Sequence, residues 1–314
     1  MKSATSAVEG SMDSAYVPES KVKTKAFIAL GLVCFFWGTT WVVSRQGVLH
    51  MPALQFAAIR QLLGGFCYVV FFTVRGYRLP RGREWRTVII LSILNFVCSN
   101  GLSTWGVRYI SAGLASIISA IFPLWLVVIS LFTLKSKMPR KTLLGMLLGF
   151  SGICVIFYEH LKDFLVPEFR FGICLSLLAT ITWAFGTLYT KRQATEFNPY
   201  FSLGLQMVIS GFILLSACNY TNNAIALSAI PWQSWASITF LIVFSSILCF
   251  VAYLYALQHL PTAQVSLYAY INPIVAIVIS TSFFNEVVTP FMLLGGLITL
   301  YGIYLVNRSI AKII

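Results

Sequence analysis

Charged residues are scarce in this sequence, and acidic ones are the scarcest. Charged residues make up 10% of the 314 positions, with nine Asp and Glu against 22 Lys and Arg. An average soluble domain carries roughly 25%. The mean hydropathy is +0.84, and a chain so apolar is not expected to be soluble. The excess of positive charge is typical of loops at a membrane surface, so we expect no nucleic-acid partner.

Motifs for metal-dependent or hydrolytic chemistry are also missing. The seven cysteines lie in apolar stretches and form no C-x-x-C pair, which argues against a zinc site or a disulfide framework. The sequence contains no H-E-x-x-H, no G-x-S-x-G and no acidic pair within an apolar run. We therefore expect no enzyme activity, no metal and no cofactor.

Long apolar runs, by contrast, fill the chain. A helix needs about 20 apolar residues to cross a bilayer. Hydropathy predicts an all-α polytopic membrane protein with ten transmembrane helices, at about 27–46, 53–74, 87–106, 111–134, 142–160, 170–190, 199–218, 233–257, 262–284 and 290–307. Most connections are short, so no separate soluble domain is expected. The lipid bilayer is the expected surrounding of these helices.

Lysine and arginine are unevenly distributed between the expected spans. Residues 1–25 are polar and predict a disordered tail. With this tail in the cytoplasm, nearly all basic residues of the connections lie on the cytoplasmic side, and those that do not are Arg45, Arg108, Lys162 and Arg170. Because basic loops stay in the cytoplasm, we expect both termini there and a location in the plasma (inner) membrane.

The two halves of the chain resemble each other. SAGLASIISAIFPLWLVVIS (111–130) aligns without gaps to PTAQVSLYAYINPIVAIVIS (261–280), which places Pro123 on Pro273. The expected repeats cover 26–160 and 168–308, with five spans each. Because five is odd, the second repeat enters the membrane in the opposite direction. Such inverted repeats are typical of secondary transporters.

Several segments carry a resemblance to a known family. They are W-G-T-T-W (37–41), R-Q-L-L-G-G (60–65), L-A-T-I-T-W-A-F-G-T-L-Y-T-K-R (178–192) and N-P-I (272–274) with its glycine-rich ending up to 306. The chain resembles the EamA family of the drug/metabolite transporter superfamily. The resemblance implies ten helices in two inverted repeats, a central cavity, and export of amino acids or other small metabolites.

Arg60 is the one charge expected within a span, where a charge costs a few kcal/mol. Two roles are open. Its planar guanidinium suits a substrate carboxylate. Alternatively, Arg60 is structural, reaching the outer interface or capping backbone carbonyls, and the sequence favours this second role.

Polar and aromatic side chains at helical spacing are candidates for the cavity wall. Gln264, Tyr268 and Asn272 predict one face of the ninth span. The other candidates are Trp37, Trp41, Asn95, Ser99 and Trp183. The alternative for all of them is hydrogen bonding between helices.

Prolines and glycines suggest how the helices move and pack. Pro123 and Pro273 are expected in the middle of paired helices, and we interpret them as hinge or gate elements, with static kinks as the alternative. Glycines of the fifth and tenth spans predict close packing, which we assign to the monomer in preference to a homodimer.

The features together predict a secondary transporter. We expect export of small organic metabolites, above all neutral or aromatic amino acids, by alternating access through a central cavity. No acidic residue or histidine is expected at membrane depth, which favours a facilitator over proton coupling. The alternative is an exporter of hydrophobic drugs or lipid-like molecules.

Overall fold

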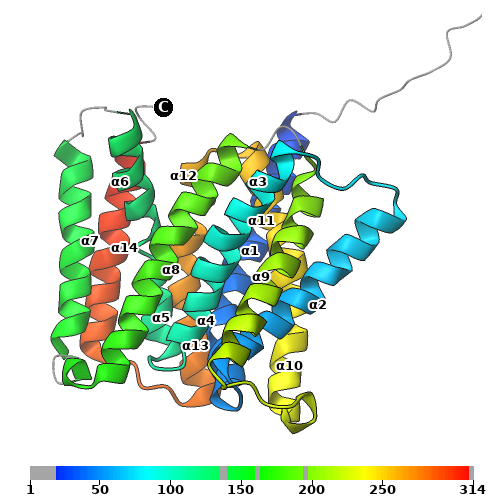
Figure 1. The fold of residues 1–314 in the computed structure, drawn as a ribbon. Coiled ribbons are helices and arrows are strands. Elements are labelled where there is room, and N and C mark those ends of the chain that lie inside the picture. Colours follow the sequence, from blue (N-terminus) through cyan, green and yellow to red (C-terminus); the bar gives the residue numbers. More distant parts are fainter. Residues whose placement is uncertain (1–18, 135–139, 160–162, 194–196, 311–314) are drawn as a thin grey trace, which may run out of the picture.

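Helices form most of the described chain. The computed structural model describes residues 19–134, 140–159, 163–193 and 197–310, and within these ranges the regular elements are helices without a strand (Figure 1). Because a bilayer offers no water to unpaired backbone groups, an apolar chain satisfies them within helices. The all-helical class expected from composition is therefore confirmed.

The elements follow one another in chain order. In the first half they are α1 (Glu19–Leu49), α2 (Ala53–Val74), α3 (Arg83–Leu91), η1 (Ser92–Gly101), α4 (Leu102–Gly106), α5 (Ala112–Ser119), α6 (Phe122–Leu134) and α7 (Arg140–Glu159). In the second half they are η2 (Asp163–Leu165), α8 (Pro167–Arg192), α9 (Pro199–Tyr220), η3 (Leu227–Ala229), α10 (Trp232–Phe240), η4 (Leu241–Cys249), α11 (Phe250–His259), α12 (Thr262–Val265), α13 (Tyr268–Phe284) and α14 (Pro290–Ile310).

Seven helical stretches of the described chain are long and apolar enough to cross a membrane. Three further apolar helices, Leu143–Ile156, Tyr268–Phe284 and Pro290–Val306, are shorter. Each expected span overlaps one of these stretches. The polar tail expected over 1–25 overlaps α1, which begins at Glu19. Residues 1–18 lie outside the described part.

Two helix pairs, α2 with α9 and α7 with α14, form the most extensive contacts. Glycines allow both approaches. Gly65 faces the backbone of Gly204, and Gly145 faces the backbone of Gly302. The glycine faces predicted in the fifth and tenth spans thus pack against each other within one chain.

Two of the expected spans are broken into two helices. The first is interrupted at Ala120 and Ile121, between α5 and α6, and the second at Ser266 and Leu267, between α12 and α13. Pro123 therefore lies in the first turn of α6 and not in mid-helix as predicted. Because it lacks an N–H, it cannot bond the carbonyl of Ser119, and the α-helix ends there.

Pro273, in contrast, is buried inside α13, as the sequence predicts. The break in its span lies earlier, where tight bonds run from Leu267 N to Gln264 O (3.1 Å) and from Ala269 N to Ser266 O (3.0 Å). The α-helix is interrupted here, between Gln264 and Tyr268. The two prolines thus occupy different local structures despite their alignment.

Two further spans contain π-helical turns in their middle. η1 joins α3 to α4, and η4 joins α10 to α11. A π-helix bonds residue i to i+5 and so presents a different set of side chains than an α-helix of the same sequence. The two segments occur at equivalent places in the two halves.

One end of the bundle carries the start of α1, the connection from α2 to α3, and the end of α14, at the upper edge of Figure 1. We call it the basic end, since the arginines of 75–86 and Lys191 lie there. At this end, Lys191 Nζ donates to the carbonyl of Leu257 (2.5 Å). At the opposite end, Arg45 Nη1 donates to the carbonyl of Val107 (2.6 Å).

A cavity around Arg60 as the candidate solute site

A cavity inside the bundle gathers most of the predicted site residues. We call it the Arg60 cavity. Its wall includes Trp37, Trp41, Arg60, Asn95, Ser99, Trp183, Tyr268 and Asn272. They come from α1, α2, η1, α8 and α13, so the site draws on both halves of the chain. Residues that the sequence reasoning did not select complete the wall, among them Asn100, Ser245 and Phe250.

Gln264 is the predicted site residue that the structure places elsewhere. It is exposed on the short helix α12 and lines neither described cavity. The spacing of four that seemed to join Gln264 to Tyr268 holds only in a continuous helix. The turn at 266–267 interrupts the helix between them, and Gln264 is exposed while Tyr268 is buried.

Arg60 is deeply buried in the wall of this cavity. Its side chain is 2% exposed, and Nη2 donates to Asn100 Oδ1. The Nε atom is buried without a hydrogen-bond partner. Among the described residues no carboxylate pairs with Arg60, and the neighbour that holds it is a neutral amide. Within the described part, the guanidinium thus lies in the cavity wall without an anionic partner.

A chain of amides and hydroxyls holds Arg60 in place. Asn100 Oδ1 also accepts from Gln61 Nε2 (3.2 Å). Gln61 Nε2 lies close to the carbonyl of Phe96 (3.3 Å), and Gln61 Oε1 accepts from Ser210 Oγ. The network joins α2 to η1 and α9. A side chain anchored in this way is preorganised for a ligand.

Asn100 was missed because the sequence reasoning used α-helical spacing. That spacing selects Asn95, Ser99 and Ser103 on one face. In the π-helical turn of η1, Asn100, five positions after Asn95, also reaches the cavity. The available signal was the dipeptide of Ser99 and Asn100 in an otherwise apolar run.

Aromatic side chains form the rest of the wall. The Trp37 ring lies 5.7 Å from the ring of Trp183 and 5.2 Å from that of Tyr268, edge-on in both cases. Phe250 lies 5.2 Å from Trp37. Trp183 Nε1 donates to the hydroxyl of Tyr268 (2.7 Å). Such aromatic groups accept apolar or aromatic parts of a ligand.

The two predicted asparagines differ in their surroundings. Asn272, oriented as its neighbours require, donates to the carbonyls of Cys34 (2.9 Å) and Tyr268 (3.1 Å), so it joins α13 to α1. Asn95 is 7% exposed, and its Oδ1 has no hydrogen-bond partner. The carboxamide of Asn95 lies against the backbone of Gly186, which has no side chain to obstruct it.

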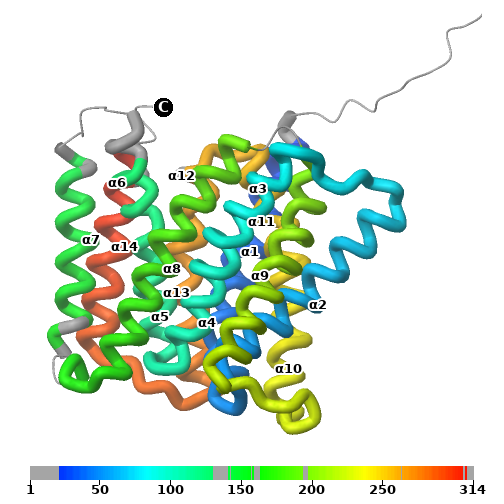
Figure 2. The backbone as a smooth tube through the Cα atoms, in the orientation of Figure 1, coloured from blue at the N-terminus to red at the C-terminus, as the bar shows by residue number. Residues whose placement is uncertain are grey.

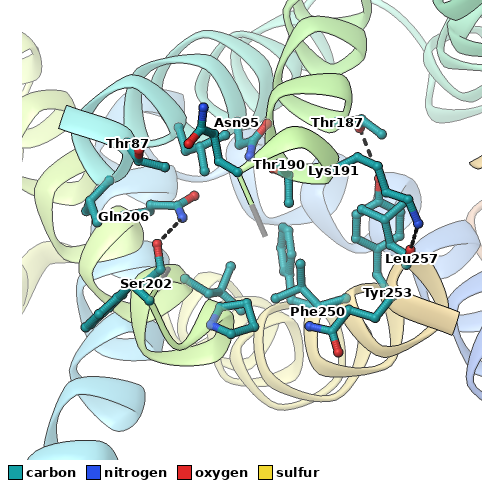
Figure 3. A pocket seen from close by; sticks show the side chains of 18 of the residues that line it. Thr87, Asn95, Thr187, Thr190, Lys191, Ser202, Gln206, Phe250, Tyr253 and Leu257 are labelled. Atoms are coloured by element: carbon teal, nitrogen blue, oxygen red, sulfur yellow. Dashed lines mark hydrogen bonds between the residues drawn. The ribbon is translucent and has the colours of Figure 1, made fainter. Parts of the chain in front are cut away.

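A second cavity lies near the basic end, with Glu84 and Lys191 in its wall, and Figure 3 shows side chains that line it. We call it the Gln206 cavity. α3, η1, α8, α9 and α11 line it, and it shares Asn95, Trp183 and Phe250 with the Arg60 cavity. Sequence reasoning missed it, although Ser202 and Gln206 are four apart in the apolar run of α9. Within the described part, neither cavity contains a group of three His, Cys, Asp or Glu that could hold a metal.

The fold and these cavities define a class of protein. In the described part of the chain, a bundle of apolar helices contains an internal cavity whose wall includes the Arg60 guanidinium, amides, hydroxyls and aromatic rings. Such a cavity suits the binding of a small amphipathic solute within a membrane. These are the features of a membrane transporter.

The sequence places the chain in a family of this class. Residues 24–158 and again 170–308 match the EamA-like transporter family, and the chain belongs to it. The family and the relatives below are transporters and not enzymes.

Relatives of similar length support the assignment. The chain is 30% identical to an uncharacterized transporter of Bacillus subtilis, YvbV, over 91% of this chain and 93% of that protein. It is 27% identical to an uncharacterized inner membrane transporter of Escherichia coli, YedA, over 90% of both chains. A crystal structure with 13% sequence identity shares the fold, with a TM-score of 0.65 over 93% of this chain.

Proposed function

We propose that this protein exports small organic solutes that carry a carboxylate, above all neutral or aromatic amino acids, by alternating access through the Arg60 cavity. The observation that carries this proposal is the Arg60 guanidinium, buried in the cavity wall without a carboxylate partner among the described residues. A buried charge without a counterion is strongly unfavourable. A carboxylate supplied by the solute would neutralise it.

The remaining wall is consistent with the rest of an amino acid. The guanidinium suits a carboxylate because it can donate two parallel hydrogen bonds. Trp37, Trp183 and Tyr268 offer apolar and π surface to a side chain or to an ammonium group. The absence of a second described charge in the wall favours solutes with a neutral side chain.

We propose further that the bundle consists of ten transmembrane helices in two inverted halves. Equivalent helices run in opposite directions: α1 descends and α8 ascends in Figures 1 and 2. The π-helical turns recur in both halves. A hydrogen bond from a basic side chain recurs as well. Arg45 of α1 donates to the carbonyl of Val107, directly after α4, and Lys191 of α8 donates to the carbonyl of Leu257 in α11. The helices α4 and α11 directly follow the π-helical segments η1 and η4. The family match over each half supports the same division.

This arrangement supports alternating access. The extensive contacts of α2 with α9 and of α7 with α14 join the halves, while the helices around the cavity are interrupted near Pro123 and before Pro273. Breaks and kinks of this kind provide the places where helices can change direction. The glycine faces are used within the chain, so we propose the monomer as the transporting unit.

For the membrane location, we propose the inner (plasma) membrane with both termini in the cytoplasm. Lysine and arginine concentrate at the basic end, where the start of α1 and the end of α14 also lie. The cytoplasmic side of a membrane protein is the positively charged one. The Gln206 cavity would then face the cytoplasm.

The proposal is tested by amino-acid counterflow in proteoliposomes, comparing wild type with Arg60→Gln. Arg170→Gln is the matched control, because Arg170 is exposed and lines neither cavity. We expect exchange of neutral amino acids by wild type and the control, and a large loss in Arg60→Gln. Insensitivity to an imposed pH gradient would support a facilitator. Equal exchange by Arg60→Gln would assign Arg60 a structural role. Transport of lipid-like dyes without any amino-acid exchange would favour the lipid or drug exporter.

A further inference from the structure

We propose that the Gln206 cavity is a second solute site, which binds uncharged amide or hydroxyl groups. It is separate from the carboxylate site at Arg60. The inference rests on the transport activity of the family and does not require the proposed role of Arg60. Its carrying observation is a buried part of the wall that is built from the neutral polar side chains of Asn95, Ser202 and Gln206.

The polar wall is built mainly from α9 and η1. Gln206 is 5% exposed, and its Nε2 donates to Ser202 Oγ (2.9 Å), which is also buried. Figure 3 shows this pair on one side of the cavity. A carboxamide has two donors and an acceptor, and a hydroxyl can donate while it accepts. The pair thus retains groups that a ligand can bond.

Asn95 adds a second carboxamide to the same wall. Its Oδ1 is buried and has no hydrogen-bond partner. A buried amide oxygen without a partner loses the hydrogen bond that water would have given it. Because this oxygen lies against the backbone of Gly186, a ligand that donates an N–H or O–H would restore the bond once the Asn95 side chain turns toward the cavity.

The charged residues of this wall are already engaged. Glu84 Oε1 lies 2.6 Å from Arg78 Nη2, and Glu84 Oε2 accepts from Arg81 N (2.7 Å). The bond to Glu84 raises the pKa of the Arg78 guanidinium. Lys191 Nζ donates to the carbonyl of Leu257, away from the open space in Figure 3. Neither charge is directed at a ligand.

The two cavities share part of their walls. Asn95, Trp183 and Phe250 line both, so a solute that moves between the cavities must pass these three side chains. Counted from the basic end, the first site would then be the neutral Gln206 cavity, and the second would be the positively charged site at Arg60. A solute with an amide or hydroxyl group and a carboxylate can use both.

The test uses two probes that differ in one group, N-acetylserinamide, which is uncharged, and N-acetylserine, which is an anion. Binding is measured by tryptophan fluorescence of the full chain in lipid nanodiscs, because Trp183 lines both cavities. The variants are Gln206→Leu and Ser202→Ala. Gln233→Leu is the matched control, since Gln233 is exposed and lines neither cavity.

We expect wild type and the control to bind N-acetylserinamide. Gln206→Leu should bind it about tenfold more weakly, which corresponds to about 1.4 kcal/mol for a lost hydrogen bond. Ser202→Ala tests the same wall if Gln206→Leu does not fold. Arg60→Gln should leave the affinity for the amide unchanged.

Three results would overturn the second site. They are no binding of N-acetylserinamide by wild type, equal binding by wild type and both wall variants, or a loss of amide binding in Arg60→Gln. Failure of the carboxylate proposal would give a different result, because N-acetylserine would then bind equally to wild type and to Arg60→Gln.

Discussion

Replacing Gly302 by alanine tests the seam between α7 and α14. A Cβ atom at Gly302 would lie 2.6 Å from the carbonyl oxygen of Gly145 and 2.8 Å from the Cα of Gly149. These are backbone atoms, which cannot turn aside as a side chain can. Ordinary carbon contacts need about 3.5–4 Å, so α14 must move away from α7 by roughly 1 Å. Side-chain contacts along the whole seam would loosen with it.

The expected loss follows from this overpacking. Inserting a methyl group into a closely packed interior lowers the free energy of unfolding by about 1–3 kcal/mol, and the rigid neighbours of Gly302 place this substitution at the upper end. Gly296→Ala is the control on the same helix, because its Cβ would meet nothing closer than 3.8 Å. Its expected effect is a gain of up to about 1 kcal/mol from helix propensity.

The assay is equilibrium unfolding in mixed detergent micelles. Gly145→Ala separates the same two helices, because its Cβ would lie 2.7 Å from the carbonyl of Gly302. The double variant Gly145→Ala/Gly302→Ala should therefore lose less stability than the two single losses added together. Equal stability of Gly302→Ala and Gly296→Ala, or strict additivity in the double variant, would refute the backbone contact.

Three further substitutions test individual contacts. Gly186→Ala must displace the Asn95 carboxamide, whose Cγ would lie 2.8 Å from the new methyl group. The transport rate should fall about as far as in Asn95→Ala. An unchanged rate would show that Asn95 does not contribute to transport. Trp183→Phe removes the 2.7 Å bond to the Tyr268 hydroxyl and should raise the KM for counterflow severalfold, whereas an unchanged KM would make that bond irrelevant to binding. Glu286→Ala removes the carboxylate that accepts from the first backbone N–H groups of α5 (3.1 and 3.3 Å), with a loss of about 1 kcal/mol in unfolding free energy; no loss would contradict the cap.

Sequence reasoning located the helices because their apolar composition is a local property. Arg60, Trp37 and Trp183 lie in the wall of one cavity, as the sequence suggested, and their role in binding a solute stays a prediction. Gln264 was misplaced, because helical spacing assumes that the helix continues, and here it ends at Val265. Local hydrogen bonding in the turn decided this, and hydropathy does not register it.

The π-helical turn and the second cavity lie beyond a local pattern. Asn100 reaches the Arg60 cavity because η1 is wound differently from an α-helix, and packing against other helices determines that winding. Gln206 and Ser202 were not selected from the sequence, although both are polar residues in the apolar run of α9. Only the space beside them, which depends on five helices at once, distinguishes a cavity wall from a packed seam.

The most direct test of the carboxylate site compares phenylalanine with phenylalaninamide as competitors of amino-acid counterflow. The two molecules share the ring and the amino group, and only the first carries a carboxylate. We predict that wild type prefers phenylalanine by roughly 10- to 100-fold, the range expected for a charge-assisted hydrogen bond of about 1.5–3 kcal/mol. Arg60→Gln should lose this preference, and Arg170→Gln should keep it. An equal preference for phenylalanine in wild type and Arg60→Gln would contradict the proposed role of Arg60.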